Sequence, residues 1–193
     1  MKNGSVHFEA QVIFDDDTIR RMFRTEYYTY ETAQRVLRLI LGAAGILAAL
    51  FLDIHTAARV VFLMFGVWML VAGDFPSKVQ AEGVIEKRGG KSSRVTYQFG
   101  SSGIQIMGGG HIPYQSLDKL IFDDEYLYLF VNRQNAVMFR ASALKPADPE
   151  RLKAEIAEKS GKSWKRLTTG ILEYNIRDVL QVIDGGKKRK SNS

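Results

Sequence analysis

Two nearly unbroken apolar runs, residues 39–52 and 60–73, constrain the fold of this chain more than any other feature. A short polar stretch, residues 53–59, separates them. Both runs would be apolar on every side of a helix, whereas a helix on the surface of a soluble protein carries a polar stripe. We therefore expect a helical hairpin within a membrane. A buried helical pair in a soluble domain is the alternative.

The length of the runs decides whether they reach across a bilayer. Each run would rise only ~21 Å as an α-helix, whereas the hydrocarbon core is ~30 Å thick. The wider limits 36–52 and 57–73 give about 25 Å each, provided that Arg38 and Arg59 extend their guanidinium groups to the headgroups. The sequence thus predicts two short spans.

Small residues predict how the two helices meet. Gly42, Gly45 and Ala49 fall on one face of the first helix. Such spacing allows two backbones to approach closely where no hydrophobic effect drives helices together. We expect the second helix to make this contact near Gly66.

Basic residues predict the orientation of the hairpin. The loop between the runs has one basic residue, Arg59, so the positive-inside rule places both termini in the cytoplasm. We expect a multi-pass protein of the cytoplasmic (inner) membrane. The flanking basic residues are Arg20, Arg21, Arg24, Arg35 and Arg38 before the runs, and Lys78, Lys87, Arg88 and Lys91 after them.

Composition excludes several classes of function. The 193 residues contain no cysteine, which rules out disulfide frameworks, thiolate zinc sites and cysteine nucleophiles. The net charge of +6 beside a membrane segment favours anionic lipid over nucleic acid as a partner. The first thirty residues lack the apolar core of a cleavable signal peptide.

The segment before the hairpin predicts a strand followed by a helix. Residues 6–14 alternate between apolar and other residues, as in a half-buried strand. The next residues, 15–18, are three aspartates and a threonine, which suit a helix N-terminus better than a cation site. From Ile19 onward the pattern is that of an amphipathic helix. It either lies on the membrane surface or packs on a soluble domain.

The segment after the hairpin predicts short strands and one helix. Close spacing with turn residues favours an antiparallel meander that closes into a small barrel or sandwich. Asp148 and Pro149 then suit the start of a helix that continues to about Ser160. The expected strands are 79–87, 94–99, 103–107, 111–114, 117–122, 126–132 and 136–140.

Four stretches resemble the YcxB-like family of bacterial membrane proteins: residues 97–104, 111–120, 126–130 and 136–144. The resemblance extends over roughly residues 6–160. It implies a strand, a helix and two transmembrane helices, followed by a pleckstrin-homology-like barrel. It implies no catalytic residues.

Together these patterns predict a membrane α+β fold, with a transmembrane helical hairpin and a small antiparallel pleckstrin-homology-like β-barrel capped by a C-terminal helix. The expected segments are 1–35 (strand and amphipathic helix), 36–75 (hairpin), 76–160 (YcxB-type domain) and 161–193 (a further amphipathic helix and a basic tail).

Candidate binding residues are basic. A turn expected between the first two strands of the barrel carries Lys87, Arg88, Lys91 and Arg94, where many pleckstrin-homology domains hold acidic headgroups. A solvated basic turn is the alternative. The tail residues Lys187, Lys188, Arg189 and Lys190 either bind the membrane surface or only increase solubility. Asp123, Asp124 and Glu125 are interpreted as a solvated acidic turn.

Nothing in the sequence argues for catalysis, a cofactor or a metal, since the three histidines are scattered and no nucleophile motif is present. We expect a non-enzymatic bacterial inner-membrane protein that presents a cytoplasmic pleckstrin-homology-like domain for protein or anionic-lipid binding. The alternative is a membrane-embedded accessory subunit of a transport or envelope-stress complex that acts through its hairpin. Expected partners are the lipid bilayer, an unknown protein and another copy of the chain in a homo-oligomer.

Overall fold

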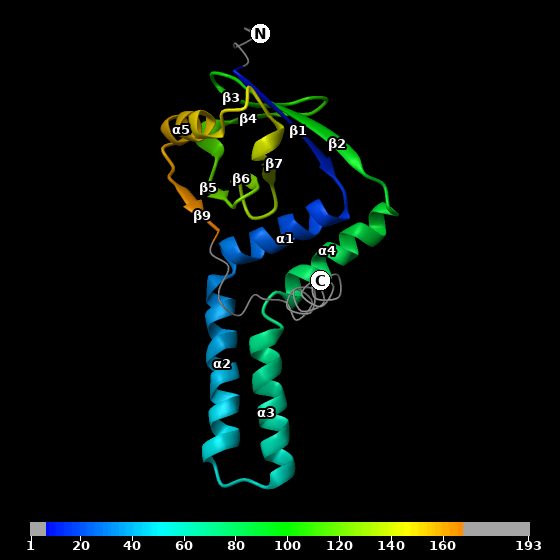
Figure 1. The fold of residues 1–193 in the computed structure, drawn as a ribbon, viewed down its shortest axis with the longest axis vertical. Coiled ribbons are helices and arrows are strands. Elements are labelled where there is room, and N and C mark those ends of the chain that lie inside the picture. The colour runs from blue at the N-terminus through cyan, green and yellow to red at the C-terminus, as the bar shows by residue number, and fades with distance from the viewer. Residues whose placement is uncertain (1–6, 168–193) are drawn as a thin grey trace, which may run out of the picture. The chain divides into compact units, whose positions relative to one another are not determined.

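The structure of this chain, a computed structural model, describes residues 7–167, and they separate into two units (Figure 1). The first, which we call the mixed unit, contains residues 7–30 and 77–167. The second, which we call the hairpin, contains residues 31–76. The expected N-terminal strand and helix thus belong to the same unit as the strands that follow the hairpin.

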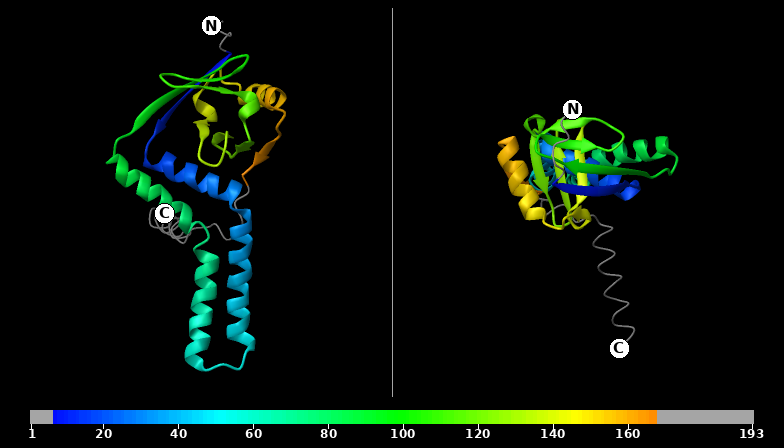
Figure 2. Two further views of the ribbon diagram at one scale, coloured as in Figure 1. Left: turned by 180° about the vertical axis from the view of Figure 1, so that it is seen from behind. Right: turned by 90° about the horizontal axis from the view of Figure 1, so that it is seen from above.

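The first sheet of the mixed unit has β1 as an interior strand. Its order is β4-β3-β2-β1-β8, and all neighbours are antiparallel. β1 pairs with β2 along its whole length, from Phe8 opposite Phe99 to Phe14 opposite Ser93 (Figure 2). The strands are β1 (Phe8–Phe14), β2 (Ser93–Phe99), β3 (Gly103–Ile106), β4 (His111–Pro113) and β8 (Leu144–Lys145).

The second sheet has the order β7-β6-β5-β9. β9 lies beyond the expected domain and pairs parallel to β5, whereas the other pairs are antiparallel. Within residues 7–167 the two sheets are separate, so the described strands do not close into the expected barrel. The strands are β5 (Lys119–Phe122), β6 (Tyr126–Phe130), β7 (Ala136–Arg140) and β9 (Trp164–Arg166), and the 3-10 turns are η1 (Tyr114–Ser116) and η2 (Ala141–Ala143).

The main core contains residues from both sheets and from α5 (Pro149–Ser160). Phe99 and Phe139 meet with ring centroids 5.2 Å apart, and Leu152 and Ile156 of α5 are fully buried. α5 begins as predicted, because the Arg151 amide donates to Asp148 Oδ1 at 3.0 Å and proline occupies the first turn.

Helix α1 (Asp16–Tyr30) packs on the second sheet. Met22 and Tyr30 contact a buried cluster on the β5, β6 and β7 strands that includes Tyr128 and Met138. The apolar side of this helix is therefore covered by the sheet. Of the two expected alternatives, the helix packs on a domain and does not use this side to lie on the membrane surface. Asp15 caps the helix by accepting from the Thr18 amide at 2.8 Å, and the hydrogen bonds from Thr18 hold the pKa of the Asp15 carboxyl below its usual value.

The expected strand at 79–87 is wrong: these residues belong to helix α4 (Phe75–Arg88). Val79, Ala81, Gly83 and Ile85 alternate with mostly polar residues, which imitates a strand. Ala, Gln, Glu and Lys favour a helix, and the two basic residues in its last turn suit the helix dipole. Buried Ser77 and Ala81 lie one helical turn apart.

The hairpin consists of α2 (Thr32–Phe51) and α3 (Thr56–Val71), which meet through glycine as predicted. Gly42, Gly45 and Gly66 are buried. A Cβ atom added at Gly66 would lie 2.8 Å from Gly42 O. Since real Cβ atoms do not approach an oxygen so closely, only glycine allows this contact.

Candidate functional site

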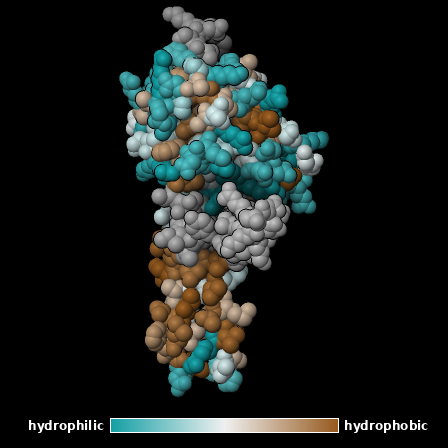
Figure 3. All heavy atoms as spheres, in the orientation of Figure 1, coloured by the Kyte–Doolittle hydropathy of each residue, from teal (hydrophilic) through white to brown (hydrophobic). Residues whose placement is uncertain are grey.

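The face of the hairpin that Figure 3 shows is mostly apolar, and exposed large apolar side chains occur on both helices. By length and composition α2 is able to cross a membrane, and α3 passes the same test only when joined to α4 across a bend of 61°. Only 17% of the apolar window of α2 is buried, unlike the core helix of a soluble protein. Exposed large side chains include Leu37, Ile40, Leu47 and Leu50 of α2, and Val61, Phe62, Met64, Phe65 and Trp68 of α3.

Two arginines lie at the two ends of the hairpin. Arg38 of α2 donates to Gly73 O just after α3, at 3.3 Å, and Arg59 of α3 donates to Leu52 O just after α2, at 3.4 Å. Each guanidinium therefore supplies a donor and a positive charge to the C-terminal carbonyls of the opposite helix.

The spacing of these contacts is regular. In α2 and the residue that follows it, Arg38 lies seven residues before Gly45, and the acceptor Leu52 lies seven residues after it. In α3 and the residues that follow it, Arg59, Gly66 and the acceptor Gly73 have the same spacing. A Cβ atom added at Gly45 would lie 3.3 Å from Gly66 Cα, so the helices meet midway between the two arginines. The sequence contains this repeat, but the small residues alone do not reveal it.

The candidate basic turn follows α4 and precedes β2, so it does not join two strands as expected. Lys87, Lys91 and Arg94 are exposed. Arg88 instead points inward, and its Nη2 donates to Phe14 O at 2.9 Å and Ser93 Oγ at 3.2 Å. The structure thus gives Arg88 a role in holding the end of β1, and leaves three of the four candidates at the surface.

A hollow of about 330 Å³ beside this turn is acidic. Among the described residues that line it, Arg20 is the one cation, and this side chain pairs with Glu82 at 2.7 Å and with Asp17 at 3.1 Å. The negative charges of the aspartates that line the hollow repel an anion. The lining residues are Asp15, Asp16, Asp17, Arg20, Gly90 and Ser92.

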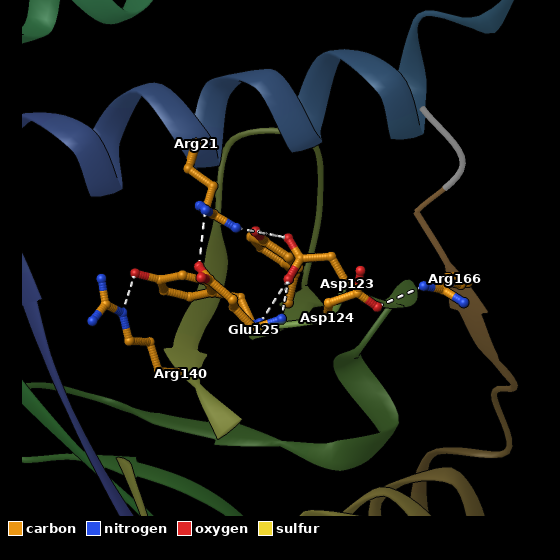
Figure 4. A network of polar contacts seen from close by, with 8 residues as sticks. Arg21, Asp123, Asp124, Glu125, Arg140 and Arg166 are labelled. Carbon is orange, nitrogen blue, oxygen red and sulfur yellow. Dashed lines mark hydrogen bonds and ion pairs between the residues drawn. The ribbon is translucent and has the colours of Figure 1, made fainter. Parts of the chain in front are cut away.

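Asp123 is not part of a solvated turn, because it is the centre of a polar network (Figure 4). Its Oδ2 accepts from Tyr128 Oη at 2.8 Å and pairs with Arg21 at 3.2 Å. Its Oδ1 accepts the amides of Glu125 and Tyr126, at 2.8 and 2.7 Å. Asp124, by contrast, is exposed and pairs with Arg166.

The same network surrounds Tyr126 with cations. The Arg21 guanidinium lies 4.6 Å from the Tyr126 ring centroid, and Arg140 Nε contacts Tyr126 Oη at 2.6 Å. Burial raises the pKa of the Tyr128 hydroxyl well above its usual value, so this group stays neutral. We interpret the network as a clamp that holds α1 on the second sheet, since its groups bond to one another.

A second contact holds the end of α1, where the chain leaves the mixed unit. Lys119 Nζ donates to Thr29 O at 3.0 Å and lies 3.8 Å from the Tyr30 ring centroid, and Tyr30 Oη donates to Asp118 at 2.8 Å. Sequence reasoning missed these residues because partners ninety positions apart leave no local pattern.

The basic tail is the remaining candidate site. The basic tail, Lys187 to Lys190, and the helix expected before it lie outside the described residues. Within residues 7–167 no three His, Asp or Glu side chains gather in a way that could hold a metal ion.

The family model described as YcxB-like protein matches residues 99–156, from the end of β2 into α5. This match confirms the resemblance over that part of the chain, which contains a YcxB-like domain. No curated protein and no solved structure matches the chain.

Proposed function

Since this chain contains a YcxB-like domain, we propose that it is a non-enzymatic bacterial inner-membrane protein whose hairpin crosses the bilayer twice. The mixed unit is then a cytoplasmic binding module held at the membrane surface. The function has two parts, an anchor and a module, and each has its own support.

The pairing of β1 with β2 carries the proposal. β1 precedes the hairpin and β2 follows it, yet all seven residues of β1 have a partner in β2. Strands of one sheet lie on the same side of a membrane, so the intervening chain crosses an even number of times. A single crossing by α2 would place the two strands on opposite sides.

The second crossing is assigned to α3 alone. Its 16 residues rise ~24 Å, close to the apolar length of α2. α4 is an unsuitable continuation, because from Ser77 onward it belongs to the mixed unit. The exposed apolar side chains around both helices support lipid contact.

The basic residues that flank the hairpin support a cytoplasmic position for the mixed unit. For its ligand, Lys87, Lys91 and Arg94 offer exposed cations, but the acidic hollow beside them weakens the attraction for an anionic headgroup. A protein partner is therefore the ligand class that we favour. The contacts give little support to the alternative, an accessory subunit that acts through its hairpin. The small residues that could receive another protein's helix already contact each other within the hairpin.

Cysteine labelling of the full chain tests the anchor. The chain has no cysteine, so Ile54→Cys in the hairpin loop and Ser101→Cys in the mixed unit each introduce a unique thiol. We expect a membrane-impermeant maleimide to label the first only from the periplasmic face and the second only from the cytoplasmic face. Labelling of both thiols from one face of sealed vesicles would refute the two crossings.

Binding to anionic lipid is tested separately. Full chain in nanodiscs of neutral lipid would be titrated with vesicles that contain phosphatidylglycerol, and sedimentation would be measured. We expect weak association. Strong, salt-sensitive binding that is lost in the Lys91→Gln, Arg94→Gln double variant would instead identify the headgroup as the ligand.

A further inference from the structure

The hairpin has two sharply defined polar ends. At one end Arg38 donates to Gly73 O, and at the other Arg59 donates to Leu52 O. Residues 39–52 and 60–73 between these ends contain no charged side chain. The apolar band therefore measures ~21 Å along each helix.

The packing of the hairpin prevents the band from lengthening. α2 and α3 are in backbone contact at Gly45 and Gly66, where an added Cβ would lie 3.3 Å from the opposite Cα. Helices that touch this closely do not slide past each other without losing the contact. Tilting shortens the distance that a helix spans, so it provides no extra reach.

The arginines do not extend the band outward. A long basic side chain often reaches the headgroups from a position inside the apolar layer. Here both guanidinium groups already bond to terminal carbonyls of the neighbouring helix, so each charge stays near the level of Gly73 or Leu52. The apolar band is thus several ångströms shorter than a hydrocarbon core of ~30 Å.

From these lengths we infer that the hairpin prefers thin bilayers, and that its favoured lipid partners have short acyl chains. This inference rests on the proposed double crossing. In a thicker membrane the lipids around the hairpin compress to cover the band, at a free-energy cost for each ångström of mismatch. The chain therefore sorts to thin regions of a membrane or gathers short-chain lipids around itself.

Vesicles that differ only in acyl-chain length test this inference. Full chain with Ile54→Cys would be reconstituted into phosphatidylcholine with monounsaturated chains of fourteen to twenty-two carbons. The measured quantity is the fraction of loop thiol that an impermeant maleimide reaches only after detergent is added. We expect the largest fraction at the shortest chains, and a fall on the order of tenfold at the longest.

A matched pair of variants at Arg59 identifies the cause. Arg59→Leu, made in the same Ile54→Cys background, lengthens the apolar band of α3 by about one helical turn, so the best chain length increases. Arg59→Lys keeps the charge at the same level, so the best chain length stays the same.

The outcomes separate the two proposals. Equal protection at every chain length, or no shift with Arg59→Leu, overturns the preference for thin bilayers but leaves the double crossing intact. A thiol that is open to the reagent in every lipid overturns the double crossing as well.

Discussion

The hairpin and the mixed unit use the same residue types in opposite ways. Phe62 and Phe65 of the hairpin are each 42% exposed, whereas Phe99 and Phe139 in the mixed unit are almost completely buried. The hairpin joins its helices through glycine, and the mixed unit joins its sheets through aromatic rings. The proposed anchor accounts for this difference, because lipid as a solvent favours close backbones, whereas water favours a large buried side-chain area.

Truncation of a buried phenylalanine should cause the largest difference in stability between the two regions. Phe139→Ala removes a fully buried ring and leaves a cavity, so we expect a loss of about 3–5 kcal/mol in the free energy of unfolding of the mixed unit. Phe62→Ala on the hairpin surface is the matched control, with little effect on that unit. Chemical denaturation in detergent, followed by tryptophan fluorescence, measures both. Equal losses would contradict the assignment of different solvents.

Removal of the Asp123 carboxylate ranks second. Asp123→Ala leaves Tyr128 and two amides without this acceptor and removes one of the carboxylates that pair with Arg21, so we expect the mixed unit to lose roughly 2–3 kcal/mol. Asp124→Ala removes one exposed ion pair, for which at most about 1 kcal/mol is expected. Urea denaturation of both variants decides the point. Similar losses would show that Asp123 is an ordinary solvated residue.

Replacing glycine by alanine should destabilise the hairpin and stabilise the mixed unit. Gly66→Ala places a Cβ 2.8 Å from Gly42 O, so we expect the helical pair to lose about 1–3 kcal/mol. In α4 a Cβ at Gly83 meets no atom of residues 7–167 within 4 Å apart from its own helix backbone, so Gly83→Ala should stabilise the mixed unit by about 0.4–1 kcal/mol. Loss of helical circular dichroism in detergent reports on the first change, and urea denaturation on the second. Two changes of the same sign would be inconsistent with these contacts.

The smallest expected effect is the pH dependence of the α1 cap. Because the pKa of folded Asp15 is depressed, its stabilising contribution is complete above the usual carboxyl pKa and disappears as the pH falls below about 4. Asp15→Ala should cost about 1 kcal/mol at neutral pH and less in acid. Asp17→Ala, at a position 94% exposed, is the control. The check is the unfolding free energy from pH 7 to pH 3, and a difference between wild type and Asp15→Ala that does not shrink in acid would contradict the role of the carboxylate.

Much of the local structure was predictable because its causes lie within a few residues. The alternation of residues 6–14 gave β1, Asp148 with Pro149 gave the start of α5, and Gly42 with Gly45 gave the contact face of α2. The prediction of a strand at 79–87 was wrong for a related reason. Its alternation is also a local signal, but there the helix-forming residues and the burial of Ala81 favour a helix.

The candidate site was less predictable. The basic turn could be found as a run of charge, but nothing local showed that Arg88 bonds to the end of β1. Similarly, Asp123 and Asp124 are neighbours of the same type, and they differ because Arg21 of α1 and Tyr128 of β6 both approach Asp123. Charge in a sequence locates a surface, whereas the partner that faces each charge decides its role.

By itself, the sequence determined that this chain has two short apolar helices with small residues where they meet, because those properties depend only on helical periodicity and side-chain size. Only the tertiary structure decided that β1 enters the sheet formed after the hairpin. That pairing joins residues from 79 positions apart (Phe14 and Ser93) to 91 positions apart (Phe8 and Phe99), so no local pattern encodes it. It also places the two strands that flank the hairpin side by side in one sheet, and the proposed anchor starts from this pairing.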